Sequence, residues 1–189
     1  ENLAITLELD HEERLKLRDL HLLTMKPFLY VVNLHENQIK TFDKSVYIKS
    51  LKVDDESKII PICAKVEEDL IGFTKEEADM FLQEVGLKET GLNELIKAAY
   101  KSLKLITYFT AGPMEVRAWT VEKGSKAPEA AGVIHTDFQK GFIKAEVMKY
   151  KDFVALGGEQ NVKEKGLLKI EGKEYIVQDG DIMHFRFAN

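Results

Sequence analysis

The residues best suited to ligand chemistry lie in the stretch FLYVVNLHE, where an apolar run ends abruptly in polar side chains. Asn33 and Glu36 follow the five apolar residues 28–32. An asparagine amide presents a donor and an acceptor in one plane, which suits the edge of a purine ring. A carboxylate three residues later can accept hydrogen bonds from ring nitrogens and exocyclic amines. The segment Cys63-Ala64-Lys65 adds backbone N–H groups and the stem of a lysine.

A purely structural explanation of Asn33 stays open, because asparagine is common in turns at the ends of strands. The tetrapeptide Asn33-Leu34-His35-Glu36 alone favours that explanation. The second polar segment, at a suitable separation along the chain, brings purine recognition and the structural explanation to near equality.

The elements that position these residues form a predicted βαβ unit. Residues 28–32 and 59–62 are apolar runs of strand length, and residues 43–53 between them predict a short crossover helix. The continuous run 28–32 predicts a strand buried on both faces of a parallel sheet. Ligands bind outside the carboxyl ends of parallel strands, so the two polar segments are predicted to lie together at one edge.

Helical patterns flank this unit. Asp10 and Glu13 form a capping box, and the leucines behind them predict a broad apolar helix that Pro27 stops. Thr74 begins a second amphipathic helix that ends at Gly86, and Thr90 precedes a third. The second and third helices are predicted to cover the sheet.

Beyond residue 105 the apolar pattern changes from helical to alternating. Residues 105–112 and 115–124 predict two strands, Pro128 predicts the start of a helix, and residues 142–150 predict a third strand. The segment 166–187, with Asp179-Gly180 as a turn signal, predicts a closing hairpin. This order indicates a small α+β sheet wrapped on one helix.

Other chemical candidates are better explained structurally. No histidine spacing ties Cys63 to a general base, so a buried structural cysteine is favoured. His135-Thr136-Asp137 follows a short helix and favours capping over catalysis. The aromatic residues of the alternating segment favour a core role over base stacking: Tyr108, Phe109 and Trp119. The spacing of cysteines and histidines predicts no metal site.

A phosphate-binding loop is missing from the pattern. The chain has no G-x-x-x-x-G-K-[ST] motif, and Gly157-Gly158 is followed by Glu-Gln-Asn. A purine base is therefore predicted to be recognised here while its phosphates are held elsewhere. The chain also lacks an initiator methionine, so we expect it to be a piece of a longer protein whose phosphate-binding half lies upstream.

Composition limits the other possibilities. The 189 residues suffice for one large or two small domains, with 44% hydrophobic and 31% charged residues, as in a soluble globular protein. The net charge of −5 lies entirely in residues 1–104, which disfavours strong non-specific nucleic-acid binding. A single cysteine, no apolar run of about 20 residues and no signal peptide favour a cytoplasmic protein without a membrane span.

The sequence resembles the YchF/Obg-like ATPase family of P-loop NTPases along its whole length. KPFLYVVNLHE is similar to that family's N-x-x-E variant of the N-K-x-D base-specificity motif, and PICAK is similar to the adjoining base-contact loop. Several long runs resemble the family's C-terminal portion, among them GSKAPEAAGVIHTDFQKGFIKAEV and the ending VQDGDIMHFRF. That ending, with the strands before it, resembles a ubiquitin-like β-grasp TGS domain.

The resemblance implies a fold and a division of the chain. Residues 1–26 would be the end of an inserted helical domain and its return helix. Residues 27–104 would be the C-terminal part of an α/β P-loop NTPase domain, and residues 105–189 an α+β TGS domain. The P-loop, the switch regions and the Mg²⁺ ligands would lie upstream, so no catalytic residue or metal ligand is expected here. The implied base-binding residues are Asn33, Leu34, Glu36, Cys63, Ala64 and Lys65.

The resemblance also implies a function. The parent protein would be a ribosome-associated, cytoplasmic hydrolase that uses ATP at least as well as GTP, with Mg²⁺. Glu36 is one methylene longer than the aspartate of N-K-x-D proteins, and Leu34 replaces their lysine, which would misplace the guanine-specific hydrogen bonds. The TGS domain would bind ribosome, RNA or a translation-related protein. The alternative is a non-catalytic β-grasp module for such partners.

Overall fold

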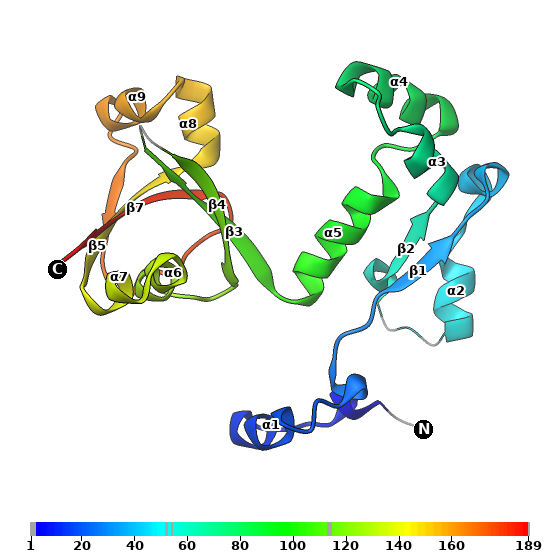
Figure 1. Cartoon of the computed structure of the whole chain (residues 1–189), viewed down its shortest axis with the longest axis horizontal. Coiled ribbons are helices and arrows are strands. Elements are labelled where there is room, and N and C mark those ends of the chain that lie inside the picture. The colour runs from blue at the N-terminus through cyan, green and yellow to red at the C-terminus, as the bar shows by residue number, and fades with distance from the viewer. Residues whose placement is uncertain (1–2, 52, 54, 113–114, 189) are drawn as a thin grey trace. The chain divides into compact units, whose positions relative to one another are not determined.

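The computed structural model describes residues 3–51, 53, 55–112 and 115–188, apart from the side chain of His11 (Figure 1). The chain divides into two compact units, Glu1–Leu103 and Lys104–Asn189, each with its own sheet. None of the helices in the described ranges is long and apolar enough to cross a membrane.

The first unit contains the predicted βαβ arrangement. Strands β1 (Tyr30–Asn33) and β2 (Ile59–Ile62) are parallel and pair along all four of their residues. Helix α2 (Lys44–Leu51) lies between them in the chain, flanked by the 3₁₀ helices η3 (Glu36–Thr41) and η4 (Glu56–Lys58). The parallel pairing confirms that the two polar segments leave the sheet at the same edge.

Strand β1 differs from its prediction in length and burial. It begins at Tyr30 rather than at residue 28, includes Asn33, and is not buried on both faces, because Val31 is 50% exposed. Among the described residues β1 pairs only with β2, and the principal helix contacts of this sheet, from α2 and α5, are made with β2. A strand at an edge with few helix contacts keeps one face open to solvent.

The N-terminal helix is shorter than predicted. Helix α1 (His11–Arg18) starts at the predicted capping box, with Asp10 accepting a bond from the Glu13 N–H at 2.8 Å. It ends at Arg18, because His21 has a left-handed backbone (φ 48°) that an α-helix cannot continue. Short 3₁₀ helices stand on either side, η1 (Ala4–Thr6) and η2 (Leu23–Met25). The expected broad apolar helix face is therefore not formed.

Three further helices complete the first unit: α3 (Ala64–Asp69), α4 (Lys75–Val85) and α5 (Gly91–Ser102). Thr74 and Glu77 form the predicted capping box of α4, and Gly86 ends that helix in a left-handed conformation. Thr90 caps α5 as predicted. Helix α5 packs against β2, whereas the principal contacts of α4 are with η3.

The second unit is a five-stranded sheet in the order β4-β3-β7-β5-β6. The central strand β7 is parallel to β3 and antiparallel to β5, and the pairs β3–β4 and β5–β6 are antiparallel. The strands are β3 (Leu105–Ala111), β4 (Val116–Glu122), β5 (Phe142–Lys149), β6 (Lys169–Glu171) and β7 (Asp181–Phe187). The predicted link between β3 and β4 through Gly112-Pro113 includes a residue outside the described ranges.

The predicted closing hairpin is wrong, because β6 and β7 do not pair. The segment between them crosses to the start of α6, where the Ala127 N–H bonds to the Tyr175 carbonyl and the Val177 N–H to the Ser125 carbonyl. Gly180 does form a turn with a left-handed backbone, but that turn leads β7 between β3 and β5. Tertiary contacts of the connection therefore override the local hairpin signal.

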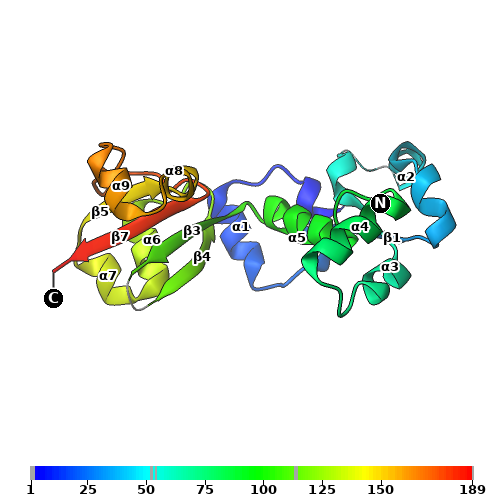
Figure 2. The same cartoon turned by 90° about the horizontal axis from the view of Figure 1, so that it is seen from above.

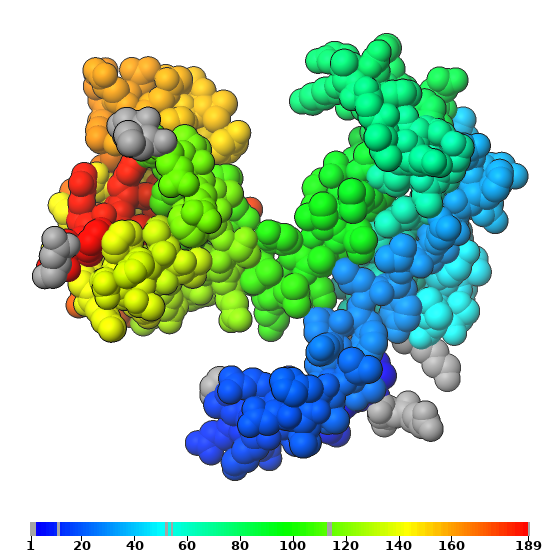
Figure 3. All heavy atoms as spheres, viewed as in Figure 1, coloured from blue at the N-terminus to red at the C-terminus, as the bar shows by residue number. Residues whose placement is uncertain are grey.

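The sequence predicts a sheet wrapped on one helix, but helices cover both faces of this sheet (Figures 1 and 2). Helices α6 (Ala127–Ile134) and α7 (Thr136–Lys140) pack on the face that contains Tyr108 and Met183. Helices α8 (Tyr150–Leu156) and α9 (Glu159–Glu164) pack on the other face, over Met148 and Ile182. Figure 3 shows the atoms of α8 and α9 (orange) as a layer on the rest of this unit.

The fully buried carboxylate of Asp181 holds the start of β7. Its Oδ1 accepts from Lys149 Nζ at 2.6 Å, and its Oδ2 accepts from the Tyr175 hydroxyl at 2.7 Å and the Gln178 N–H at 2.9 Å. Burial, together with this carboxylate, raises the pKa of Tyr175, so the hydroxyl remains a donor at neutral pH. One side chain thus ties β5 and the crossing segment to β7.

We expect Asp181→Asn to lower the free energy of unfolding by about 2 kcal/mol, because a buried amide N–H₂ must then face one of the three donors that the carboxylate accepts from. Urea unfolding followed by the fluorescence of Trp119, the only tryptophan, measures this change in the second unit. Glu174→Gln is the matched control: Glu174 lies at the same 2.6 Å from Lys126 but is 84% exposed. Equal effects of the two substitutions would contradict this account.

Candidate functional site

The candidate site is the edge of the first sheet where β1 and β2 end. The Leu34 N–H donates to the Ile62 carbonyl at 2.7 Å, which extends the parallel ladder past the last strand residues. The Ala64 N–H donates to Asn33 Oδ1 at 3.3 Å. The structure therefore brings together the two segments that the sequence singles out.

The amide of Asn33 is exposed and oriented by this contact. Its Oδ1 has a second lone pair beside the one directed at Ala64, and its Nδ2 has two N–H groups. An oriented amide with donors and an acceptor in one plane can pair with the edge of a planar heterocycle. The bond to Ala64 also means that Asn33 helps to shape the neighbouring loop.

Leu34 and Cys63 have their side chains inside the protein. Leu34 is 8% exposed and Cys63 is 5% exposed. The Cys63 side chain packs with Val66 and Leu82 in an apolar cluster. The contacts of both residues with a ligand at the surface are therefore restricted to backbone atoms.

Glu36 and Lys65 are the charged groups of the site, and both are exposed. Lys65 Nζ lies 2.6 Å from Asp69 Oδ1 and 3.7 Å from Glu68 Oε2. The hydrogen bond and charge of Asp69 raise the pKa of Lys65, with smaller contributions from Glu68 and Glu36. The ammonium therefore stays protonated at neutral pH and is held on α3, one turn along the helix from its own backbone.

Residues 35–38 form a local cap at the start of η3. The His35 N–H donates to Gln38 Oε1 at 2.8 Å, and His35 Nδ1 lies 3.1 Å from Asn37 Oδ1. These contacts start η3 at Glu36. They leave the carboxylate of Glu36 at the surface, three residues beyond Asn33.

The remaining chemical candidates have structural roles. His135 caps α7 by accepting from the Asp137 N–H at 3.2 Å. The Tyr108 hydroxyl, fully buried, donates to the Ala130 carbonyl at 2.8 Å. Trp119 Nε1 donates to Thr110 Oγ1. Over the described residues, no three His, Cys, Asp or Glu side chains form a group that could hold a metal ion.

Two features were missed at the level of sequence. Glu67 accepts a hydrogen bond from the Leu92 N–H at 3.3 Å, which joins α3 to the start of α5, and no spacing signals a contact 25 residues apart.

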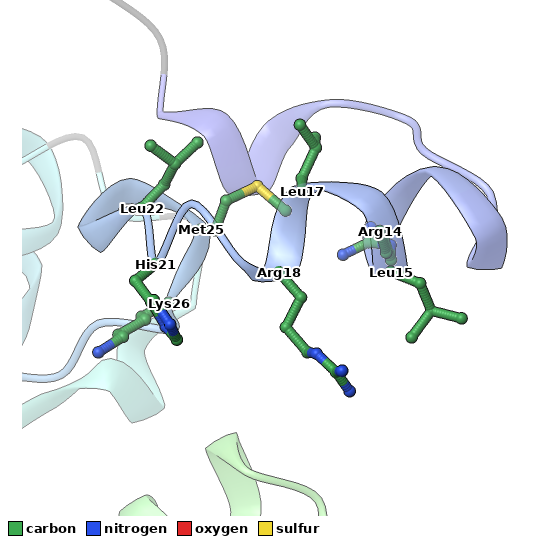
Figure 4. Close-up of a pocket in the computed structure, with 8 residues that line it drawn as sticks. All are labelled: Arg14, Leu15, Leu17, Arg18, His21, Leu22, Met25 and Lys26. Carbon is green, nitrogen blue, oxygen red and sulfur yellow. The ribbon is translucent and has the colours of Figure 1, made fainter.

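The second feature is a hollow of about 330 Å³ beside α1 (Figure 4). Four basic and four apolar residues line it: Arg14, Arg18, His21, Lys26, Leu15, Leu17, Leu22 and Met25. No residue of the sheet edge borders this hollow.

Comparison with known proteins gives the family. The chain is 48% identical over 187 residues to the ribosome-binding ATPase YchF of Bacillus subtilis (strain 168), covering 97% of this chain and 51% of that protein. It is 48% identical over 181 residues to the protein of the same name from Escherichia coli O157:H7, covering 96% and 50%. The chain belongs to the YchF family.

A family model and a solved structure agree with YchF membership, and a more distant structure supports the fold. The family model YchF-GTPase_C, described as a protein of unknown function (DUF933), matches residues 105–188. The solved structure of the Schizosaccharomyces pombe YchF GTPase has a TM-score of 0.81 and 37% identity, covering 98% of this chain and 50% of that one. A GTP-binding protein from Pyrococcus horikoshii OT3 has a TM-score of 0.58 at 18% identity over 86% and 46% of the two chains, which supports the fold alone. The chain spans about half the length of the curated YchF relatives it matches.

We expect the Cys63 thiol to react with a soluble disulfide reagent at least about tenfold more slowly in the native chain than in urea, because burial excludes the reagent. The chain has one cysteine, so the reaction rate reports this site directly. A native rate equal to the unfolded rate would show that the thiol faces solvent beside Ala64.

Proposed function

We propose that this chain is the base-reading and partner-binding portion of a ribosome-associated YchF-type nucleotide hydrolase that acts in the cytoplasm. The observation that supports this most directly is the 3.3 Å contact between Asn33 Oδ1 and the Ala64 N–H at the end of a parallel strand pair. That contact unites two polar segments where ligands of parallel sheets bind. The names of the relatives supply the activity, ATP hydrolysis, and the partner, the ribosome.

The proposed base contacts are the amide of Asn33, the carboxylate of Glu36, the stem of Lys65, and backbone atoms of Leu34, Cys63 and Ala64. The buried side chain of Leu34 supports a loose purine preference, since a lysine cannot occupy that position without burying its charge. Glu36 begins η3 on an exposed loop, which supports a carboxylate displaced from the guanine edge. Adenine is then accepted through the oriented amide.

Hydrolysis itself is proposed for the parent protein only. ATP or GTP with Mg²⁺ would need a phosphate-binding loop, and the sequence of this chain contains no such motif. We propose that residues 27–104 complete a P-loop NTPase domain and that residues 1–26 belong to a helical insertion. The isolated chain would bind nucleotide weakly and turn none over.

Residues 105–189 are proposed to form a ubiquitin-like β-grasp TGS domain that binds the ribosome or another translation-related partner. The strand order supports this, because the first and last strands of the unit are parallel neighbours in the middle of the sheet. The charge of this part is balanced, with 12 basic and 12 acidic residues. Such a surface is better suited to binding a protein or a folded RNA through complementary shape than to binding many phosphates through positive charge.

A second candidate function is a non-catalytic β-grasp binding module. The match of the family model to residues 105–188 alone favours it, because that unit contains none of the proposed base-reading residues. Mg²⁺-dependent ATP turnover by the natural full-length polypeptide would exclude this candidate.

We expect Glu36→Asp in the full-length polypeptide to move the ratio of GTP to ATP affinity towards GTP by about tenfold, because a shorter carboxylate restores the reach of an N-x-x-D motif. Calorimetric titration with each nucleotide measures the ratio. Glu76→Asp, an exposed substitution in the first turn of α4, is the control and should leave the ratio unchanged. An unchanged ratio in Glu36→Asp would refute the proposed role of the carboxylate.

We expect the 189-residue chain to co-sediment with purified ribosomes and to lose less than about tenfold in affinity between roughly 50 and 200 mM salt, because its second unit has no excess positive charge. A steeper loss would indicate phosphate contacts in place of the shaped contact. Absence of binding at every salt concentration would remove this unit as the ribosome-binding part.

A further inference from the structure

The start of α5 is bound to the same sheet edge that holds the candidate site. Glu67 Oε1 accepts from the Leu92 N–H, in the first turn of α5, at 3.3 Å. Glu67 lies on α3, which begins at Ala64, so one short helix joins the base-reading loop to α5. A carboxylate at the N-terminus of a 12-residue helix is favoured by the free N–H groups and the helix dipole.

Gly91 brings the α5 backbone into direct contact with the end of β2. A Cβ atom at Gly91 would lie 2.8 Å from Ile62 Cγ1 and 2.9 Å from the Pro61 carbonyl oxygen, distances that real Cβ atoms essentially never show. Gly91 is buried. The close approach therefore requires glycine, and it places the first turn of α5 against the last strand residue before the base-reading loop.

The two contacts enclose the loop from both sides. Ile62 accepts the Leu34 N–H at 2.7 Å, which aligns the two strand ends, and Ala64 donates to Asn33. Gly91 packs against Ile62 at the start of residues 62–64. Glu67, on α3 just after them, accepts from the Leu92 N–H of α5. The backbone of residues 62–64 is thus fixed at both of its ends by α5.

The Glu67 contact adds to the local cap of α5, because several N–H groups at the start of a helix have no partner within it. Thr90 already accepts from the Asn93 N–H at 3.1 Å, as the residue at the start of α5. A second acceptor from 25 residues away adds a link between elements. Glu67 therefore satisfies a second N–H of α5 and also joins α5 to α3.

We infer that Glu67 and Gly91 are positioning residues for purine recognition, and that they act by clamping the 62–64 backbone against Asn33 through the first turn of α5. The inference rests on the proposed function only for its ligand; the clamp itself is a property of this chain. It assigns to α5, which contributes no base contact, a share in base selectivity.

Hydrogen exchange of the 189-residue chain tests the clamp without nucleotide. We expect Glu67→Ala to speed exchange of the Leu34 and Ala64 amides at least about fivefold, because α3 is then released from α5. Glu67→Gln keeps an acceptor oxygen and should restore slow exchange. Glu77→Ala, which removes the matching glutamate from the capping box of α4, should leave these two amides unchanged.

Nucleotide binding by the natural full-length polypeptide tests the consequence. We expect Glu67→Ala to weaken ATP binding and to reduce the discrimination of ATP against a pyrimidine triphosphate at least about fivefold, with Glu77→Ala unchanged. Gly91→Ala should do the same more strongly if it folds. Weaker binding of both nucleotides in equal proportion would indicate general destabilisation and would overturn the positioning role.

The outcomes separate the two proposals. If wild-type full-length protein binds no purine nucleotide while the Glu67→Ala amides still exchange faster, the proposed function fails and the clamp remains. If the wild type binds ATP but Glu67→Ala changes neither selectivity nor exchange, the clamp is overturned and the proposed function remains.

Discussion

The candidate site depends on one short stretch of parallel backbone pairing. β1 and β2 share four residue pairs, and the Leu34 N–H extends the ladder to the Ile62 carbonyl. Because parallel strands end at the same edge, this pairing brings Asn33 beside Ala64. The Ala64 N–H then donates to Asn33 Oδ1 and joins the two segments. Everything proposed for the site, from the amide of Asn33 to the α5 clamp, relies on the register of these few hydrogen bonds.

A pairing of this size is weak by itself, so packing from outside must hold it. Two-stranded sheets are marginal in water unless a further element covers them. In the first unit α5 meets that need by packing on β2, and Gly91 permits its close approach to Ile62. The packing of α5 therefore stabilises the sheet and also sets the geometry of its candidate binding edge. In the proposed function, a helix that contacts no ligand would then contribute to purine recognition.

The second unit is stabilised differently, by a central strand that comes from the end of the chain. Its last strand, β7, is central and pairs on both sides, so the sheet closes only when the end of the chain is in place. The buried carboxylate of Asp181 tethers the beginning of that strand through Lys149, Tyr175 and Gln178. The result is a sheet with apolar layers on both faces and a balanced surface charge. In the proposed function, this surface would bind its partner through complementary shape.

The sequence by itself determined the features with local causes. Capping pairs such as Thr74 with Glu77 start helices, Gly86 ends one, and the spacing of the runs 28–32 and 59–62 requires a parallel βαβ unit that brings Asn33 to Ala64. Tertiary structure decided the rest. The exposure of Val31, the place of β7 and the reach of Glu67 to Leu92 depend on which surfaces meet across distant parts of the chain, and periodicity within a segment contains no information about them.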